Sequence, residues 1–125
     1  MSIAISRELE AAPTSGPLPF ELTLTFRAAA TDDDVLTDVV YRIVEVAGEP
    51  LDVAFETPTG PFKTLRREKV TFTALPQDVA EPMRLIPAGK GDKPKLVTIW
   101  ASIVAPDTDD DTSPIERTAC TVRIQ

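Results

Sequence analysis

Short runs of alternating apolar and polar residues, separated by prolines, are the feature that most restricts the fold of this 125-residue chain. In the clearest run, 20–27, every even-numbered residue is apolar and every odd-numbered residue is polar. Because side chains on a strand point alternately to opposite faces, this run predicts a strand with one side in a core and the other in solvent. Most of the twelve prolines fall at or outside the ends of such runs, where their missing N–H breaks no ladder.

The same pattern predicts seven strands, at about 2–9, 19–28, 38–46, 51–56, 68–75, 95–105 and 115–124. An eighth run, Met83–Ile86, is short and lies between two prolines, so we expect seven to eight strands. Helix signals are nearly absent, and only 77–81 could form a single turn. Short strands at near-regular spacing, with turn residues between them, predict an all-β fold: one antiparallel β-sandwich domain over residues 1–125.

Parity within each run predicts which side chains face the core: Leu22, Leu24, Phe26, Val53, Phe55, Val70, Phe72, Val97, Ile99, Ile103, Val122 and Ile124. The run 39–44 is apolar on both parities, which is typical of a strand inside a sheet whose second face is partly covered. In architecture the expected fold resembles an immunoglobulin-like sandwich. It lacks the cysteine pair and the tryptophan of antibody domains, and its only tyrosine, Tyr41, is on the third strand instead of at a tyrosine corner.

The formal charge of −7 favours solubility and disfavours binding to nucleic acid or to an anionic membrane, since both need a positive surface. No segment approaches the roughly 20 apolar residues that cross a bilayer. The N-terminus has no basic region followed by an apolar stretch, so we expect no signal peptide and a protein that is cytoplasmic or built into a virion. The single cysteine, Cys120, has the apolar parity of its run and is expected in the core.

Two acidic segments are candidate calcium ligands, because Ca²⁺ prefers six to eight oxygen ligands. They contain Asp32, Asp33, Asp34 and Asp38, and Asp107, Asp109, Asp110 and Asp111. EF-hand spacing is absent, since the sixth position counted from Asp107 is threonine instead of glycine and the twelfth is threonine instead of glutamate. Strand parity predicts that the two segments share one end of the sandwich unless Met83–Ile86 crosses it. The alternative is that these aspartates only solvate loop tips.

Basic residues form two clusters: Lys63, Arg66, Arg67 and Lys69, and Lys90, Lys93 and Lys95. Neither has a glycine-rich phosphate loop or aromatic residues for base stacking, so we expect solvated faces or pairing with the acidic segments. The only tryptophan, Trp100, has the parity opposite to the core. It is expected either under a loop or exposed for a partner.

Catalytic chemistry has little support in the sequence. The absence of histidine removes the usual general base and excludes Ser/His/Asp and Cys/His sites within one chain. No Asp-Thr-Gly or Asp-Ser-Gly motif of an aspartic protease is present. A pair of glycosidase carboxylates remains as an alternative, although one tryptophan and one tyrosine offer little platform for a sugar.

These observations favour a non-catalytic structural or interaction module without a cofactor, one that binds a protein partner or a second copy of itself. Its most concrete form is an accessory subunit of a larger assembly, such as a virion or capsid decoration protein. The alternative function is a calcium-dependent binding domain that uses the acidic loops at 32–38 and 107–111. An enzyme with a carboxylate pair is the third hypothesis.

Overall fold

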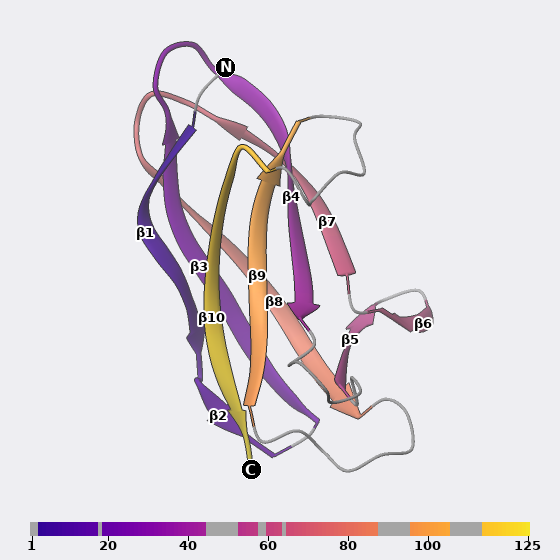
Figure 1. Cartoon of the computed structure of the whole chain (residues 1–125). Coiled ribbons are helices and arrows are strands. Elements are labelled where there is room, and N and C mark those ends of the chain that lie inside the picture. Colours follow the sequence, from indigo (N-terminus) through magenta and orange to yellow (C-terminus); the bar gives the residue numbers. More distant parts are fainter. Residues whose placement is uncertain are drawn as a thin grey trace.

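The computed structural model describes residues 3–17, 19–44, 53–57, 60–63, 65–87, 96–105 and 114–125. These segments form two sheets packed face to face, a β-sandwich (Figure 1). In order across the first sheet lie β1 (Ile3–Ala12), β3 (Phe20–Ala30), β8 (Gln77–Pro87), β5 (Val53–Thr57) and β6 (Gly60–Lys63). In order across the second sheet lie β2 (Ser15–Gly16), β10 (Glu116–Ile124), β9 (Leu96–Val104), β4 (Val35–Val44) and β7 (Leu65–Phe72). The described residues include no helix, and hence none that could cross a membrane.

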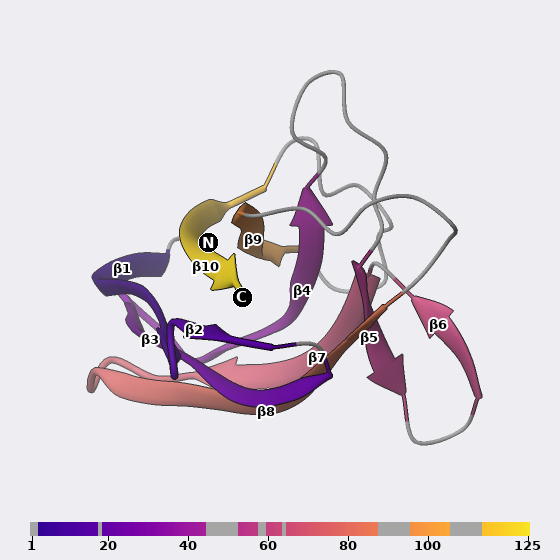
Figure 2. The same cartoon turned by 90° about the horizontal axis from the view of Figure 1, so that it is seen from below.

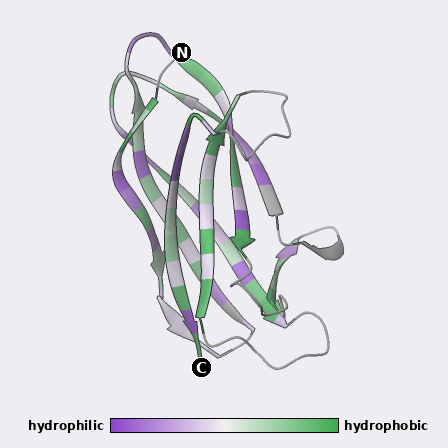
Figure 3. Cartoon of the chain, viewed as in Figure 1, coloured by the Kyte–Doolittle hydropathy of each residue, from purple (hydrophilic) through white to green (hydrophobic). Residues whose placement is uncertain are grey.

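The core lies between the sheets, where β3 and β8 face β9 and β10 across the interior (Figure 2). Eleven of the twelve side chains predicted to face inward are buried, which confirms the parity argument, and the twelfth, Val70, packs partly buried against them. Phe26 of the first sheet and Phe72 of the second have ring centroids 6.5 Å apart, so aromatic packing joins the two layers. Figure 3 shows the resulting alternation of hydrophobic and hydrophilic residues along the strands.

The two ends of the chain are held by strand pairing. Strand β1 pairs with β3 in the first sheet, and the chain then passes to the second sheet, where β2 runs parallel to the end of β10. The Arg123 N–H donates to the Thr14 carbonyl and the Gln125 N–H to the Gly16 carbonyl, both at 2.9 Å. Between the sheets, the Leu9 N–H donates to the buried Thr118 Oγ1 at 2.9 Å. The N-terminal segment therefore closes one side of the sandwich.

In strand β8 the predicted helical turn is wrong, and the short predicted run Met83–Ile86 is part of a longer strand. Residues 77–81 are extended instead of helical, and they join Met83–Ile86 in one strand of eleven residues. The pairing partner explains this, because β3 offers β8 a continuous antiparallel register from Phe20 to Ala28. Pro82 is accommodated because, among the described residues, β5 pairs only with positions 85–87 of β8, which leaves Pro82 a partner on one side alone.

The described segments contain ten strands instead of the seven to eight expected, and the two additions are β2 and β6. Strand β6 also decides which loops share an end. Strand β8 does cross the sandwich, so the parity argument would place the two acidic segments at opposite ends. The additional reversal between β5 and β6 adds one crossing, so the number of strands that cross the sandwich between the two segments is even again. Val104 at the end of β9 pairs with Asp38 near the start of β4. The end of β9 therefore lies at the end of the sandwich where β4 begins, while the second acidic segment, 107–111, lies outside the described residues.

Candidate binding face

The outer side of the second sheet carries the chain's only tryptophan among arginines. Trp100 lies in the middle of β9, half-buried, with Arg42 of β4 and Ala119 of β10 as its cross-strand neighbours. Arg117 is the diagonal neighbour on β10, and its guanidinium carbon lies 4.1 Å from the centre of the Trp100 ring. A cation at this distance is attracted by the negative face of the indole. Trp100 is therefore neither fully covered nor fully exposed, and a stacked arginine holds it on the outer face.

Hydrogen bonding fixes Arg117 in this position. Its Nε donates to Ser102 Oγ at 3.2 Å, and Ser102 is the residue directly opposite Arg117 in the β9–β10 register. Ser102 is itself buried, as is its neighbour Val40 on β4. The guanidinium thus contacts both the sheet and the indole ring, which restricts its rotamers.

A second arginine on this side binds the only carboxylate described there. Asp38 of β4 has a side chain only 3% exposed, and Arg67 of β7 reaches it with both Nε and Nη2 at 2.9 Å from Oδ2. A carboxylate removed from water to this degree needs such a partner, because desolvation of an uncompensated charge is costly. The run 39–44 was predicted to have its second face partly covered, and the burial of Val40 confirms this.

We call the outer side of the second sheet the basic face and define it by six residues: Arg42, Arg67, Lys69, Trp100, Arg117 and Arg123. Five of them are cationic, and within the described residues Asp38 is the one acidic side chain on the same side of these four strands. Lys69 and Arg123 are exposed. A chain with seven more acidic than basic residues therefore concentrates cations on one face.

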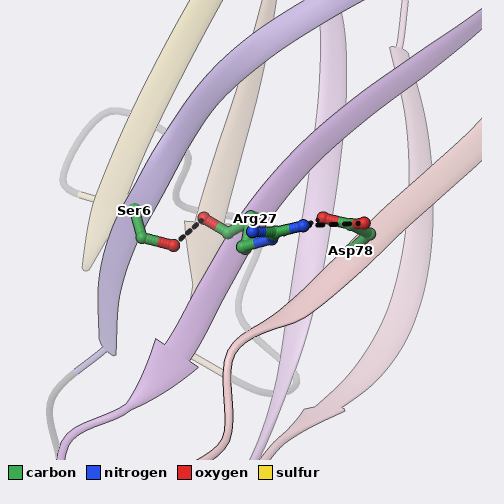
Figure 4. Close-up of polar contacts among 3 residues, drawn as sticks. All are labelled: Ser6, Arg27 and Asp78. Atoms are coloured by element: carbon green, nitrogen blue, oxygen red, sulfur yellow. Dashed lines mark hydrogen bonds and ion pairs between the residues drawn. The ribbon is translucent and has the colours of Figure 1, made fainter.

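The outer side of the first sheet has a different charge arrangement (Figure 4). Arg27 of β3 donates through Nε to Asp78 of β8 at 2.8 Å, and Ser6 of β1 donates to the Arg27 carbonyl at 3.5 Å. Hydrogen bonding to Arg27 lowers the pKa of Asp78, and the same bond raises the pKa of Arg27. Arg84 pairs in the same way with Glu56 at 3.1 Å. On this face each of these cations has an acidic partner on a neighbouring strand.

The acidic candidates are only partly placed by the structure. Asp32, Asp33 and Asp34 lie exposed in the turn between β3 and β4. Asp38 lies within β4 instead and is buried against Arg67. Asp107, Asp109, Asp110 and Asp111 lie outside the described residues. Within the described part of the chain, no three acidic or cysteine side chains are grouped so that they could hold a metal ion.

The basic candidates divide between the basic face and the segments that are not described. Arg67 and Lys69 lie on the basic face. Lys90, Lys93 and Lys95 lie outside the described residues, as do the side chains of Lys63 and Arg66. The three arginines missed by the sequence argument are Arg42, Arg117 and Arg123. Their outward parity was readable in the sequence, but their approach to Trp100 depends on strand register, which was not.

Cys120 lies on the inner side of β10, partly buried, and packs against the core as its parity predicted. Burial raises the pKa of its thiol to about 11. The thiolate is the nucleophilic form, so this environment suppresses thiol reactivity at neutral pH.

No protein-family model matches this sequence, and no curated protein matches it either.

Proposed function

We propose that this protein is a non-catalytic interaction module that binds an acidic protein surface through its basic face. The observation that carries the proposal is the Arg117 guanidinium stacked 4.1 Å from the centre of the Trp100 ring, on a face where the described residues include five cations and one carboxylate. Tryptophan and arginine are the residues most enriched among the energetic centres of protein interfaces. A face that holds both in fixed positions loses little conformational entropy on binding.

The proposal extends to the class of sandwich. We propose an immunoglobulin-like architecture, supported by the order β1-β3-β8-β5 in one sheet and β10-β9-β4 in the other. Immunoglobulin constant-type domains pair their strands in the corresponding order, four in one sheet and three in the other. Strands β2, β6 and β7 are additions to that scheme. Such sandwiches host many functions, so the binding proposal depends on the face and not on the fold.

A partner in a larger assembly is the setting we propose for this binding. The acidic balance of the whole chain keeps a free subunit soluble, while the basic face gives it one docking side. An accessory subunit of a cytoplasmic complex or of a virion fits these properties.

The experiment uses Trp100 as its own reporter, because it is the only tryptophan in the chain. Titration with a polyglutamate peptide at low ionic strength should shift the Trp100 fluorescence, and 0.5 M sodium chloride should abolish the shift because it screens exposed charges. The double variant Arg42→Gln plus Arg117→Gln should lose the response. The matched control, Arg27→Gln plus Arg84→Gln, removes the same charge from the first sheet and should keep it.

Two outcomes would contradict the proposal. If the control variant loses binding as completely as the basic-face variant, net charge and not the basic face is responsible. If a single-stranded oligodeoxythymidine of equal charge binds the basic face more tightly than polyglutamate does, the partner is a nucleic acid and not an acidic protein.

A calcium-dependent binding domain remains the second candidate, and one observation favours it. Asp32–Asp34 lie at the end of the sandwich where β9 ends and β10 begins, so the connection that contains Asp107–Asp111 starts and finishes at that end. Millimolar calcium should then raise the melting temperature by several degrees, as expected for a ligand of the native state alone. Sodium chloride at matched ionic strength is the control, and an equal rise in both salts would exclude a specific site.

A further inference from the structure

One end of the sandwich combines exposed acidic and exposed apolar side chains. Asp32, Asp33 and Asp34 are all exposed in the turn from β3 to β4, and Leu75 in the neighbouring turn from β7 to β8 is 76% exposed. The Ala30 N–H donates to the Thr73 carbonyl at 2.7 Å and so joins the two turns. We call these four residues, Asp32, Asp33, Asp34 and Leu75, the acidic apex.

Internal hydrogen bonds hold the apolar part of the acidic apex in place. The Leu75 N–H donates to Thr73 Oγ1 at 3.3 Å, and the Thr73 hydroxyl contacts the Leu75 carbonyl at the same distance. A large side chain that is mostly exposed on a fixed turn is a candidate anchor, since burying it against a partner removes apolar surface from water.

The basic face is complementary to the acidic apex in charge and also carries apolar side chains. Its cations match the three aspartates, and its apolar side chains include the half-buried Trp100 and Leu96, which is 50% exposed and lies on the same side of β9 with Thr98 between them. Opposite charges across an interface guide association and fix orientation, while the apolar pair supplies the desolvated centre.

The acidic apex and the basic face are different parts of the surface of one molecule. The acidic apex is formed by turns at the end of the sandwich where β4 begins, whereas Trp100 lies in the middle of β9 and Arg123 near the opposite end of β10. Contact between two different patches of identical subunits is heterologous, and such contacts continue from copy to copy instead of stopping at a closed dimer unless a ring forms.

We propose that the basic face of one molecule docks the acidic apex of a second copy of this chain, head to tail. This inference depends on the proposed function, because it names a second copy as an acidic protein surface that the basic face binds. The interaction is charge-assisted and therefore weakens as ionic strength rises.

Sedimentation velocity over a range of protein concentrations and salt tests this with neutral, nearly isosteric variants. The wild-type chain at low ionic strength should associate beyond the dimer as its concentration rises, and sodium chloride should reverse this. The face variant, Arg117→Gln plus Arg123→Gln, and the apex variant, Asp32→Asn, Asp33→Asn plus Asp34→Asn, should each weaken self-association by at least about tenfold. The control Arg27→Gln plus Arg84→Gln should associate like the wild type.

Mixing the two variants gives the decisive measurement. The face variant retains an intact acidic apex, and the apex variant retains an intact basic face. An equimolar mixture should therefore restore one contact and stop at a 1:1 complex, which also shows that both variants are folded. A wild-type chain that stays monomeric at low salt and high concentration would overturn the inference, as would a mixture that forms no 1:1 complex.

Failure here can be separated from failure of the proposed function. A monomeric chain that still binds polyglutamate through Trp100 and Arg117 would overturn self-docking and leave the binding function intact. A chain that neither associates nor binds polyglutamate would overturn both.

Discussion

The two outer faces of this sandwich differ in how their charged side chains are paired and buried. On the first sheet, Arg27 pairs with Asp78 and Arg84 with Glu56, and all four side chains remain between 40% and 48% exposed. On the outer side of the second sheet the one carboxylate of the described residues, Asp38, is buried against Arg67, and the Arg117 guanidinium lies over the Trp100 ring. Exposed pairs contribute little to stability, so the first face is a solvated exterior. The surplus of cations on the second face is what an acidic partner could use.

The largest effect should come from the core side of these same strands, because the comparison of outer faces assumes that parity is right. Phe26→Ala and Phe72→Ala remove rings that are fully buried in contact across the sheets, and each should cost about 3–5 kcal/mol of unfolding free energy. Thr25→Ala, on the outer side of β3, should stay within roughly ±0.5 kcal/mol. Chemical denaturation measures all three, and a Thr25 variant as damaged as the Phe26 variant would reverse the face assignment.

The next effect contrasts one arginine from each face. Arg67→Met should destabilise the fold by about 3 kcal/mol, because it leaves the Asp38 carboxylate buried without its arginine partner. Arg27→Met should change the free energy of unfolding very little, since Asp78 stays exposed to water when Arg27 is removed. The same denaturation experiment at pH 7 checks both. Equal losses of unfolding free energy in the two variants would mean that the arginine–carboxylate pairs of the two faces do not differ in their contribution to stability.

A smaller effect concerns the stacked arginine. A double-mutant cycle with Trp100→Leu and Arg117→Gln should give a coupling energy of about 0.5–1 kcal/mol, the range for a cation over an exposed aromatic ring. The matched cycle with Glu56→Gln and Arg84→Gln should lose its coupling in 1 M salt, where the Debye length is about 3 Å. The Trp100 coupling should persist there in part because the stack also has dispersion contacts. If both couplings vanish together, the stack is only electrostatic.

Parity placed the core correctly because alternation is a property of each strand alone. Leu22, Leu24 and Phe26 are buried as their run required, and each of the eight predicted runs overlaps a strand of the described residues. Strands β2 and β6 escaped prediction because two and four residues carry no readable period, and their pairing depends on the neighbours that the fold supplies. Residues 77–81 have little strand propensity of their own and become extended only because β3 pairs along them.

Only part of the basic face could be predicted from the sequence, for a related reason. The outward parity of Trp100 followed from its own run. The meeting of Arg117 with Trp100 depends on the register between β9 and β10, and a long connection separates these strands in the chain. A one-residue slip would turn Arg117 into the core, so register and not composition creates the face. The basic cluster at 63–69 drew attention to charge density, whereas the arginines next to Trp100, Arg42 and Arg117, come from two strands far apart in sequence.

The smallest predicted effect lies on the inner side of β10, directly behind the basic face. The native Cys120 thiol has a pKa raised by burial to about 11, against 9.0 for an unperturbed thiol. Between these values the unfolded chain releases the thiol proton while the native chain keeps it. Stability contributed by this group is therefore complete below pH 9 and declines as pH rises toward 11. The wild type should lose slightly more stability than Cys120→Ala across that window, because the contributions of all other groups are common to both proteins and cancel in the difference. Maleimide labelling at pH 7 should be slow in the native protein and fast in denaturant. Fast native labelling, or identical pH profiles for the two proteins, would mean that Cys120 is open to solvent and that the inner side of β10 is not packed as its parity predicts.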